Sequence, residues 1–338
     1  MNPFDYVRAR NPEEAIAAAS ADPAACYIGG GTNLIDLWKY DLEHPQKLVD
    51  VNGFGAGKDI VLNADGSVSL GAFRTNADTA WHPIIESRYP LLSKAILAGA
   101  SGQIRNMATN GGNLLQRTRC YYFYDAASPC NKRLPGSGCP ARQGFNRNHA
   151  ILGQSDACIA VFPSDMCVAL AALEAVVHVA GPGGKRRIPF AAFHRLPGDH
   201  PEKDNTLEPG ELITAIELPP QGFAQNYTYL KLRDRTSYAF ALVSVAVGLE
   251  LEGTVILNAR IALGGVAHKP WRVPEAEDFL IGKTPTDAHF SAAAERILAG
   301  AVGYKHNYFK IELARRAIVR ACRMALQPES QRPGAQPS

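Results

Sequence analysis

The sequence predicts an α+β fold in several modules, and three observations support this. The 338 residues are 46% hydrophobic and 20% charged, which is enough apolar material for a sizeable core and excludes a disordered chain. Strand and helix patterns alternate in the first part of the chain, whereas strand patterns precede helix patterns in the last part. Glycine (30) and proline (23) are abundant, as in a loop-rich chain. The length is typical of two or three domains.

The first two predicted modules are residues 1–57 and 58–220. Asn11 and Pro12 are residue types favoured at the N-cap and at the first position of a helix. A glycine run separates the next apolar strand from a second helix. We expect strands at 4–7, 25–28, 47–51, 60–62, 68–70, 176–180, 187–188 and 212–218, and helices at 12–20, 34–38, 76–80, 91–99 and 166–176.

Two further segments complete the predicted organisation. Residues 117–158 interrupt the second module as an insertion, because they are rich in proline and glycine and show little periodicity. The third module, residues 223–326, is predicted to be a three-stranded sheet with helices, and residues 327–338 a disordered tail. Its strands are expected at 227–232, 240–251 and 254–263, and its helices at 291–299 and 307–326.

Charge and hydropathy exclude several classes of protein. Thirty-five scattered basic residues against 32 acidic ones give a net charge of +3, which does not indicate nucleic-acid binding. The most apolar stretch, residues 158–180, contains Pro163, Asp165 and Glu174, whereas a membrane span needs roughly 20 nearly uncharged residues. The N-terminal residues show no secretory signal. We therefore expect synthesis in the cytoplasm, with export only in the company of a partner.

Two glycine-containing loops are candidate sites for an anionic cofactor. The run 29–33 (GGGTN) lies between a strand and a helix, where free N–H groups and close backbone approach suit a pyrophosphate. Its alternative role is a tight structural turn, since it is neither a Rossmann nor a Walker motif. The run 109–113 (TNGGN) is a second such loop. Two loops could hold the two phosphates of a dinucleotide such as FAD.

Two ionisable residues are weaker candidates. Asp165 begins a predicted helix, where it could contact a ligand or simply cap the helix. Lys231 is a lone cation in a strand pattern and, taken alone, is expected to face solvent.

Cysteine usage is unusual, because five of the seven cysteines lie between residues 120 and 167. Thiolates select iron–sulfur clusters, zinc or copper(I). The set Cys120, Cys130, Cys139 and Cys158 lacks the paired spacing of a zinc knuckle. An iron–sulfur cluster, zinc and unliganded thiols all remain open on spacing alone. Cys26, Cys167 and Cys322 lie in apolar patterns and are expected to be small core residues.

Taken in order, the motifs resemble the FAD-binding subunit of the molybdenum hydroxylases, the group of xanthine dehydrogenase, aldehyde oxidase and carbon monoxide dehydrogenase. The resemblance covers residues 3–325. It rests on the runs 29–34, 109–114, 163–165, 210–213, 229–235, 262–267 and 269–272. It implies a vanillyl-alcohol-oxidase-type (PCMH-type) FAD-binding domain of two α/β subdomains, followed by a C-terminal α+β domain.

The insertion is similar to that of the FAD subunit of bacterial periplasmic aldehyde oxidoreductases; the 4-hydroxybenzoyl-CoA reductase relatives carry a different one. The resemblance implies a [4Fe–4S] cluster whose ligands are Cys120, Cys130, Cys139 and Cys158. It also implies a heterotrimer in the periplasm, exported by a signal on the small subunit. That small subunit holds two [2Fe–2S] clusters, and a large subunit holds the molybdopterin cofactor where the aldehyde is oxidised.

The same resemblance implies the FAD contacts. Asp165 is expected near the ribose or adenine, Lys231 near the flavin, and Leu212 and Ile213 at the adenine pocket. The full set is Ile28, Gly29, Gly30, Gly31, Thr32, Asn33, Leu34, Gly99, Ala100, Thr109, Gly111, Gly112, Asn113, Asp165, Leu212, Ile213 and Lys231. Gly29 departs from the alanine frequent in the family, a small change. No residue is expected to be an acid, base or nucleophile.

The expected function is electron transfer from the partner's iron–sulfur clusters to FAD and then to an external acceptor, whose identity stays open. A different molybdenum hydroxylase, such as xanthine dehydrogenase or 4-hydroxybenzoyl-CoA reductase, is an alternative. A zinc-holding assembly scaffold and a stand-alone flavin oxidase are others. The stand-alone oxidase is disfavoured because no segment of the sequence has the features of a dedicated substrate-binding domain.

Overall fold

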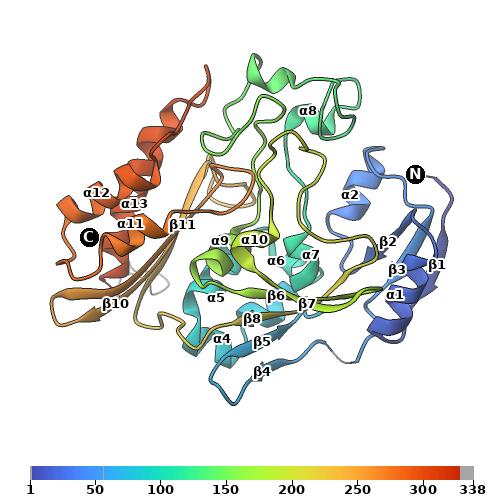
Figure 1. Ribbon diagram of the computed structural model, residues 1–338, viewed down its shortest axis with the longest axis horizontal. Coiled ribbons are helices and arrows are strands. Elements are labelled where there is room, and N and C mark those ends of the chain that lie inside the picture. Colours follow the sequence, from blue (N-terminus) through green and yellow to red (C-terminus); the bar gives the residue numbers. More distant parts are fainter. Residues whose placement is uncertain (1, 56, 328–338) are drawn as a thin grey trace.

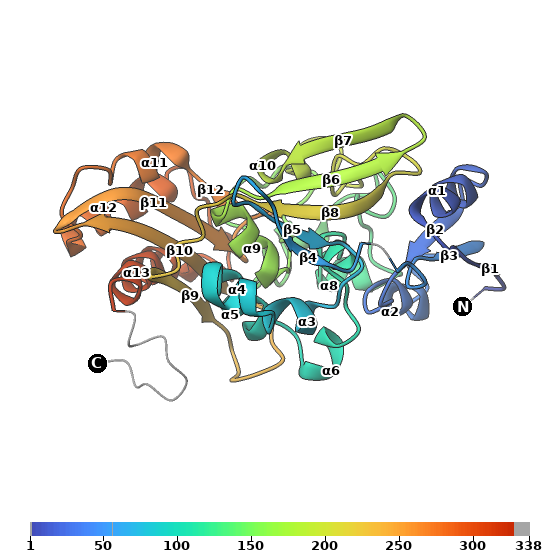
Figure 2. The same ribbon diagram turned by 90° about the horizontal axis from the view of Figure 1, so that it is seen from below.

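The computed structural model describes residues 2–55 and 57–327, and its strands form three sheets that follow one another along the molecule (Figures 1 and 2). The predicted disordered tail, apart from Gln327, lies outside the described residues. Within the described residues, no helix combines the length and the hydropathy that a membrane span requires.

The N-terminal module is a parallel three-stranded sheet in the order β1-β3-β2. Its elements are β1 (Asp5–Arg8), α1 (Pro12–Ser20), β2 (Ala25–Ile28), α2 (Leu34–Lys39) and β3 (Lys47–Asp50). Parallel strands need crossover connections, which the two helices supply. As predicted, Asn11 caps α1: its Oδ1 accepts a hydrogen bond of 2.8 Å from the Glu14 backbone N–H.

The second module is an antiparallel sheet in the order β4-β5-β8-β6-β7 with short helices around it. Its strands are β4 (Ile60–Leu62), β5 (Val68–Gly71), β6 (Val176–Gly181), β7 (Gly184–Pro189) and β8 (Leu212–Leu218). Its helices are α3 (Asn76–Ala80), α4 (Pro83–Arg88), α5 (Pro90–Ala98), α6 (Gly102–Arg105), α7 (Asn110–Leu114), α8 (Tyr121–Tyr124), α9 (Asp165–Ala172) and α10 (Phe190–Phe193). The sequence did not predict α4, although Pro83 occupies its first turn, a position that proline favours.

The C-terminal module has a four-stranded antiparallel sheet in the order β12-β11-β10-β9, not the three strands predicted. Its elements are β9 (Asn226–Leu232), β10 (Val243–Glu252), β11 (Val255–Gly264), β12 (Trp271–Arg272), α11 (Pro274–Asp278), α12 (Asp287–Ile297) and α13 (Phe309–Ala325). The extra strand, β12, has two residues, which is too short for a period-2 pattern.

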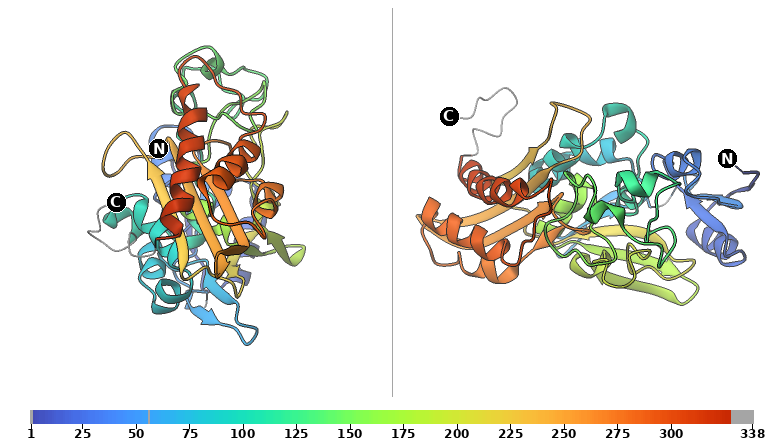
Figure 3. Two further views of the ribbon diagram at one scale, coloured as in Figure 1. Left: turned by 90° about the vertical axis from the view of Figure 1, so that its left-hand side faces the viewer. Right: turned by 90° about the horizontal axis from the view of Figure 1, so that it is seen from above.

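Strand β10 is buried on both faces, and its alternation explains how the modules join. Val245 and Val247 belong to the core beneath α12 and α13, whereas Ala246 between them belongs to the core shared with α5 and α9. Successive side chains of a strand point to opposite faces. Helices therefore cover both sides of this sheet, and α5 and α9 connect it to the second module (Figure 3).

The insertion is an ordered loop region above the junction of the modules (Figure 1). It contains α8 and one short 3₁₀ turn, Pro140–Arg142, and no strand among the described residues. Its end is tied to the C-terminal module, because the N–H groups of Ile151 and Leu152 donate to the Val266 carbonyl at 2.9 and 3.0 Å. Both side chains lie in the C-terminal core.

Candidate functional site

A cavity of about 1500 Å³ is lined by residues from all three modules. Both glycine loops contribute to its wall, as do the start of α9 and the end of β9. The predicted residues that line it are Ile28, Gly29, Gly30, Gly31, Thr32, Asn33, Leu34, Gly99, Ala100, Thr109, Gly112, Asn113, Asp165 and Lys231. The cavity therefore brings together 14 of the 17 residues that the resemblance implied for FAD.

The two glycine loops lie directly against each other. A Cβ built on Gly30 would be 1.8 Å from the Met107 carbonyl oxygen, and one built on Gly29 would be 2.8 Å from Thr109 Oγ1. Only residues without a Cβ permit this approach. The sequence predicted that the two glycine-containing runs bind one ligand from both sides. In the structure they lie side by side in one wall of one cavity.

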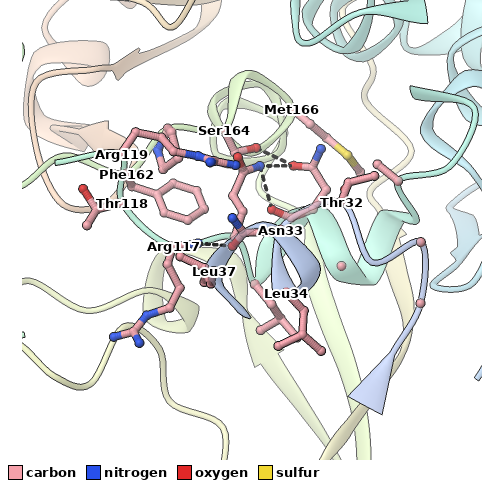
Figure 4. A pocket seen from close by; sticks show the side chains of 18 of the residues that line it. Thr32, Asn33, Leu34, Leu37, Arg117, Thr118, Arg119, Phe162, Ser164 and Met166 are labelled. Carbon is pink, nitrogen blue, oxygen red and sulfur yellow. Dashed lines mark hydrogen bonds between the residues drawn. The ribbon is translucent and has the colours of Figure 1, made fainter. Parts of the chain in front are cut away.

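The first loop leaves its backbone N–H groups available. Those of Gly29, Gly30 and Gly31 donate to no acceptor among the described residues. Gly31 has φ of +69°, a left-handed conformation that glycine adopts without strain. Asn33 ties the loop to the insertion, since its Oδ1 accepts from the Arg117 N–H at 2.8 Å (Figure 4). These unpaired amides suit the oxygens of a diphosphate.

The second glycine-containing run was predicted as a loop, but in the structure Thr109 is the N-cap of α7 and the rest of the run lies in that helix. A network of buried amides and hydroxyls holds it. Asn76 Nδ2 and Thr79 Oγ1 each donate to Asn110 Oδ1 at 3.1 Å. Asn113 Nδ2 donates to Asn76 Oδ1 at 2.7 Å, and Ser164 Oγ donates to Asn113 Oδ1 at 2.6 Å. Buried side-chain networks of this kind fix one conformation when every member is bonded. The loop is thus pre-formed.

Three implied contacts do not line the cavity. Gly111 lies against the second sheet: its N–H donates to the Ala72 carbonyl at 2.8 Å, and a Cβ there would meet Ala72 at 3.3 Å. Leu212 and Ile213 are buried in the core on β8. These residues support the wall from behind.

Asp165 and Lys231 form a buried ion pair, and Tyr229 completes it. Lys231 Nζ lies 2.7 Å from Asp165 Oδ2 and donates to the Ala98 carbonyl at 3.1 Å. The Tyr229 hydroxyl donates to Asp165 Oδ1 at 2.6 Å. The prediction from the strand pattern alone, that Lys231 faces solvent, was therefore wrong. Burial and the Asp165 charge raise the pKa of Tyr229 well above its usual value.

Asp165 is also not the helix cap that sequence reasoning allowed. Ser164 is the N-cap of α9, and its Oγ accepts from the Cys167 N–H at 3.0 Å. Asp165 occupies the next position, which leaves its carboxylate free to join two elements of the cavity wall. Sequence reasoning missed Tyr229, although it stands two residues before Lys231 and so shares its face of β9.

We expect Tyr229→Phe to lower the free energy of unfolding by about 1.5–3 kcal/mol, the range for a hydrogen bond to a charged group. The substitution leaves Asp165 Oδ1 without its donor in a buried site. Urea denaturation of the purified protein measures the change. Tyr40→Phe is the control, because that side chain is 56% exposed. Equal effects of the two substitutions would contradict the role given to Tyr229.

A second, smaller cavity lies inside the insertion. Cys120, Cys130, Cys139 and Cys158 all line it, with Lys132 and His149 beside them. In the described part of the chain, no group of three or more His, Cys, Asp or Glu side chains is arranged to hold a metal ion. The four cysteines thus share the lining of one small cavity.

The sulfurs receive several backbone N–H groups. Burial raises the pKa of Cys120 to about 12, and the N–H groups of Phe123 and Tyr122 oppose that shift. Burial raises the pKa of Cys158 to about 11, opposed by the Lys132 charge and the Ala160 N–H, which lies 3.4 Å from Sγ. The bare thiols of Cys120 and Cys158 therefore stay protonated at neutral pH, and binding of a metal would convert them to thiolates.

The other cysteines differ. Cys167 and Cys322 are fully buried in the two cores. Cys26 is half-buried and lines the large cavity, so its interpretation as a core residue was wrong.

Family comparisons agree with this geometry. Residues 2–221 match the FAD binding domain in molybdopterin dehydrogenase, and residues 227–325 match the CO dehydrogenase flavoprotein C-terminal domain. The aldehyde oxidoreductase FAD-binding subunit PaoB of Escherichia coli is 49% identical over 94% of this chain and 96% of its own length. The glyceraldehyde dehydrogenase medium chain of Sulfolobus acidocaldarius is 28% identical over 84% of this chain and 83% of its own length.

Solved structures show the same fold. A chain of quinoline 2-oxidoreductase from Pseudomonas putida 86 superposes with a TM-score of 0.74 at 26% identity, covering 96% of this chain and 98% of that one. A chain of carbon monoxide dehydrogenase from Hydrogenophaga pseudoflava superposes with a TM-score of 0.75 at 24% identity, covering 96% and 98%. The predicted fold, a PCMH-type FAD-binding domain followed by a C-terminal α+β domain, is confirmed.

Proposed function

Because this chain belongs to the FAD-binding subunits of the molybdenum hydroxylases, we propose that it is the electron-transfer subunit of an aldehyde oxidoreductase. It would take electrons from a partner's iron–sulfur clusters onto FAD and pass them to an external acceptor. The observation that carries this proposal is the cavity where two glycine loops meet and three backbone N–H groups lack an acceptor among the described residues. The 49% identity to an aldehyde oxidoreductase subunit supports the reaction class.

The residues of the large cavity fit FAD. FAD supplies the electron-accepting ring system, while the protein supplies binding and orientation. The amides of Gly29 to Gly31 would bind the diphosphate. The Lys231–Asp165 pair and Tyr229 fix the wall between α9 and β9, so that the cofactor meets a pre-formed surface. The aldehyde would be oxidised on a partner subunit, so none of these residues needs to transfer a proton to substrate.

We also propose that the cavity in the insertion holds a [4Fe–4S] cluster. Four thiolates are the ligand set of such a cluster, and the four cysteines here surround one space. Backbone N–H groups aimed at the sulfurs and the nearby Lys132 ammonium would stabilise the negative charge of the cluster. Each cysteine would bind a different iron of the cluster.

The zinc-holding scaffold is the alternative of a different class. A structural zinc site usually shows paired C-x₂₋₄-C spacing, which Cys120, Cys130, Cys139 and Cys158 lack. That spacing favours the cluster. Elemental analysis decides between them, because zinc without iron would support the scaffold.

The experiment that tests the proposed function is co-purification of the tagged chain with its partners, followed by absorption spectroscopy and metal analysis. We expect one FAD and about four irons per chain beyond those of the small subunit. A preparation with neither flavin absorption nor this iron would disprove both cofactor assignments. Flavin without the iron would disprove the cluster alone.

We expect Cys130→Ser to remove the cluster iron while FAD remains bound. A hydroxyl is a poor substitute for a thiolate ligand, so the iron should be lost. FAD should stay bound because Cys130 lines the smaller cavity and does not line the larger one. Iron and flavin are measured on the purified complex. Cys322→Ala is the matched control, because Cys322 lies in the C-terminal core. Equal iron loss in the control, or none in either variant, would contradict the ligand assignment.

For partners and location we propose a heterotrimer with a small [2Fe–2S] subunit and a large molybdopterin-cofactor subunit. The relative from Sulfolobus acidocaldarius is a medium chain, which agrees with a place among several subunits. We propose a periplasmic location reached together with a signal-bearing small subunit. Fractionation of cells with and without that subunit tests this, and periplasmic protein in its absence would contradict it.

A further inference from the structure

His149 separates the two cavities and contacts a proposed cluster ligand. Its Nε2 atom lies 3.1 Å from Cys120 Sγ, and the residue is 2% exposed. Both residues line the large cavity and the smaller one. Of the four cysteines, all among the described residues, Cys120 alone lines both cavities. The contact thus lies at the wall between the two proposed cofactor sites.

The backbone of His149 is held by buried groups of another module. Lys310 Nζ donates to the His149 carbonyl at 2.7 Å, and Asn307 Nδ2 donates to it at 3.2 Å. The His149 N–H donates to the Asn146 carbonyl at 3.0 Å. Lys310, Asn307 and Asn146 are each fully buried. The main chain that carries the imidazole is therefore held by the C-terminal module as well as by the loop of the insertion.

The surroundings select one tautomer of the ring. A neutral imidazole ring carries a single N–H, on one of its two nitrogens. Of these two, Nδ1 is buried and has no hydrogen-bond partner among the described residues. A proton on Nδ1 would leave a buried donor unbonded, and would turn the Nε2 lone pair towards the sulfur. The proton therefore belongs on Nε2.

We propose that His149 is a positioning residue whose Nε2–H donates to the Cys120 thiolate and raises the reduction potential of the cluster. This rests on the [4Fe–4S] cluster of the proposed function. A hydrogen bond to a ligand sulfur draws electron density from it, which stabilises the more negative, reduced cluster. The tuned ligand is the one at the wall shared with the FAD cavity.

The test is a potentiometric titration of the purified complex, with the cluster followed by EPR spectroscopy. For His149→Leu we expect a lower midpoint potential. The ratio of reduced to oxidised cluster at a fixed potential should fall about tenfold, or about 59 mV for one electron. His149→Gln can place an amide N–H near the same sulfur and should recover part of the shift. The potentials of the partner's clusters should not change.

Two results would overturn the inference. One is an unchanged potential in His149→Leu at full iron content, and the other is an equal shift in the Leu and Gln variants. If His149→Leu fails to retain iron, pulsed EPR of the reduced wild-type complex labelled with ¹⁵N-histidine replaces it. A weak nitrogen coupling to this cluster is expected, and its absence would refute the contact. Wild-type complex without the iron would instead refute the proposed cluster itself.

Discussion

Gly30→Ala should abolish stable FAD binding. The new Cβ would be 1.8 Å from the Met107 carbonyl oxygen and 3.0 Å from the Ala108 nitrogen, both backbone atoms that cannot rotate away. The two glycine loops must then separate. Overpacking of this kind costs about 1–3 kcal/mol, and the upper value corresponds to roughly 150-fold weaker binding. The measurements are FAD retained through gel filtration and the Kd for FAD added back to the apoprotein.

Gly102→Ala is the matched control for that substitution. Gly102 begins α6, close in sequence to the second loop, and a Cβ there meets no atom within 4 Å. Its FAD content should equal that of the wild type. Circular dichroism of both variants separates loss of cofactor from loss of fold. Full FAD content in Gly30→Ala would show that the contact between the loops does not hold the cofactor.

Local signals in the sequence predicted the elements and the glycine loops well. Strands 25–28 and 212–218 have the predicted bounds because short apolar runs end there at glycine or proline. Helix 76–80 has the predicted bounds because Thr75 caps its start. The loop 29–33 was identifiable from its three consecutive glycines. Gly30 lies against the backbone of Met107, Gly29 lies against the Thr109 side chain, and Gly31 has a positive φ. These features depend on neighbours along the chain, which a sequence displays directly.

Long-range pairs could not be predicted in the same way. Lys231 looked like an exposed strand residue, because its partner Asp165 lies 66 positions earlier. The contact of His149 with Cys120 spans 29 residues within a loop region without periodicity. Such pairs exist because three modules converge around the cavities, and no local pattern records that convergence. The family resemblance supplied part of this information, since it gave roles to Asp165 and Lys231 but none to Tyr229 or His149.

Asp204 is the clearest case of a residue that holds the insertion in place and that the sequence did not predict. It stands in the polar loop 198–210 yet lies between three cationic or ionisable side chains. Lys132 Nζ is 2.5 Å from Oδ1, Arg117 Nε is 2.8 Å from Oδ2, and His268 Nε2 is 3.3 Å from Oδ1. Arg117 also pairs with Glu43 of the N-terminal module at 2.7 Å. This one carboxylate therefore joins the insertion to the C-terminal module and, through Arg117, to the N-terminal module.

Asp204→Asn should lower the free energy of unfolding by about 3–5 kcal/mol, the range for breaking a buried ion pair from one side. The substitution keeps the shape but removes the charge that compensates Lys132, whose side chain is 1% exposed. Urea denaturation of the purified protein measures the loss. Glu312→Gln, which alters an exposed pair on α13, should leave stability nearly unchanged.

The pH dependence of that difference tests its electrostatic origin. Although burial alone would raise it, the hydrogen bond from His268 and the charges of Lys132 and Arg117 hold the pKa of Asp204 far below its usual value. A depressed pKa contributes stability that is complete above the unfolded-state pKa of about 3.9 and is lost as pH falls below it. The gap between wild type and Asp204→Asn should therefore be full near pH 7 and shrink below about pH 4. A gap independent of pH would mean that Asp204 acts through its shape and hydrogen bonds, and that its charge does not hold the insertion in place.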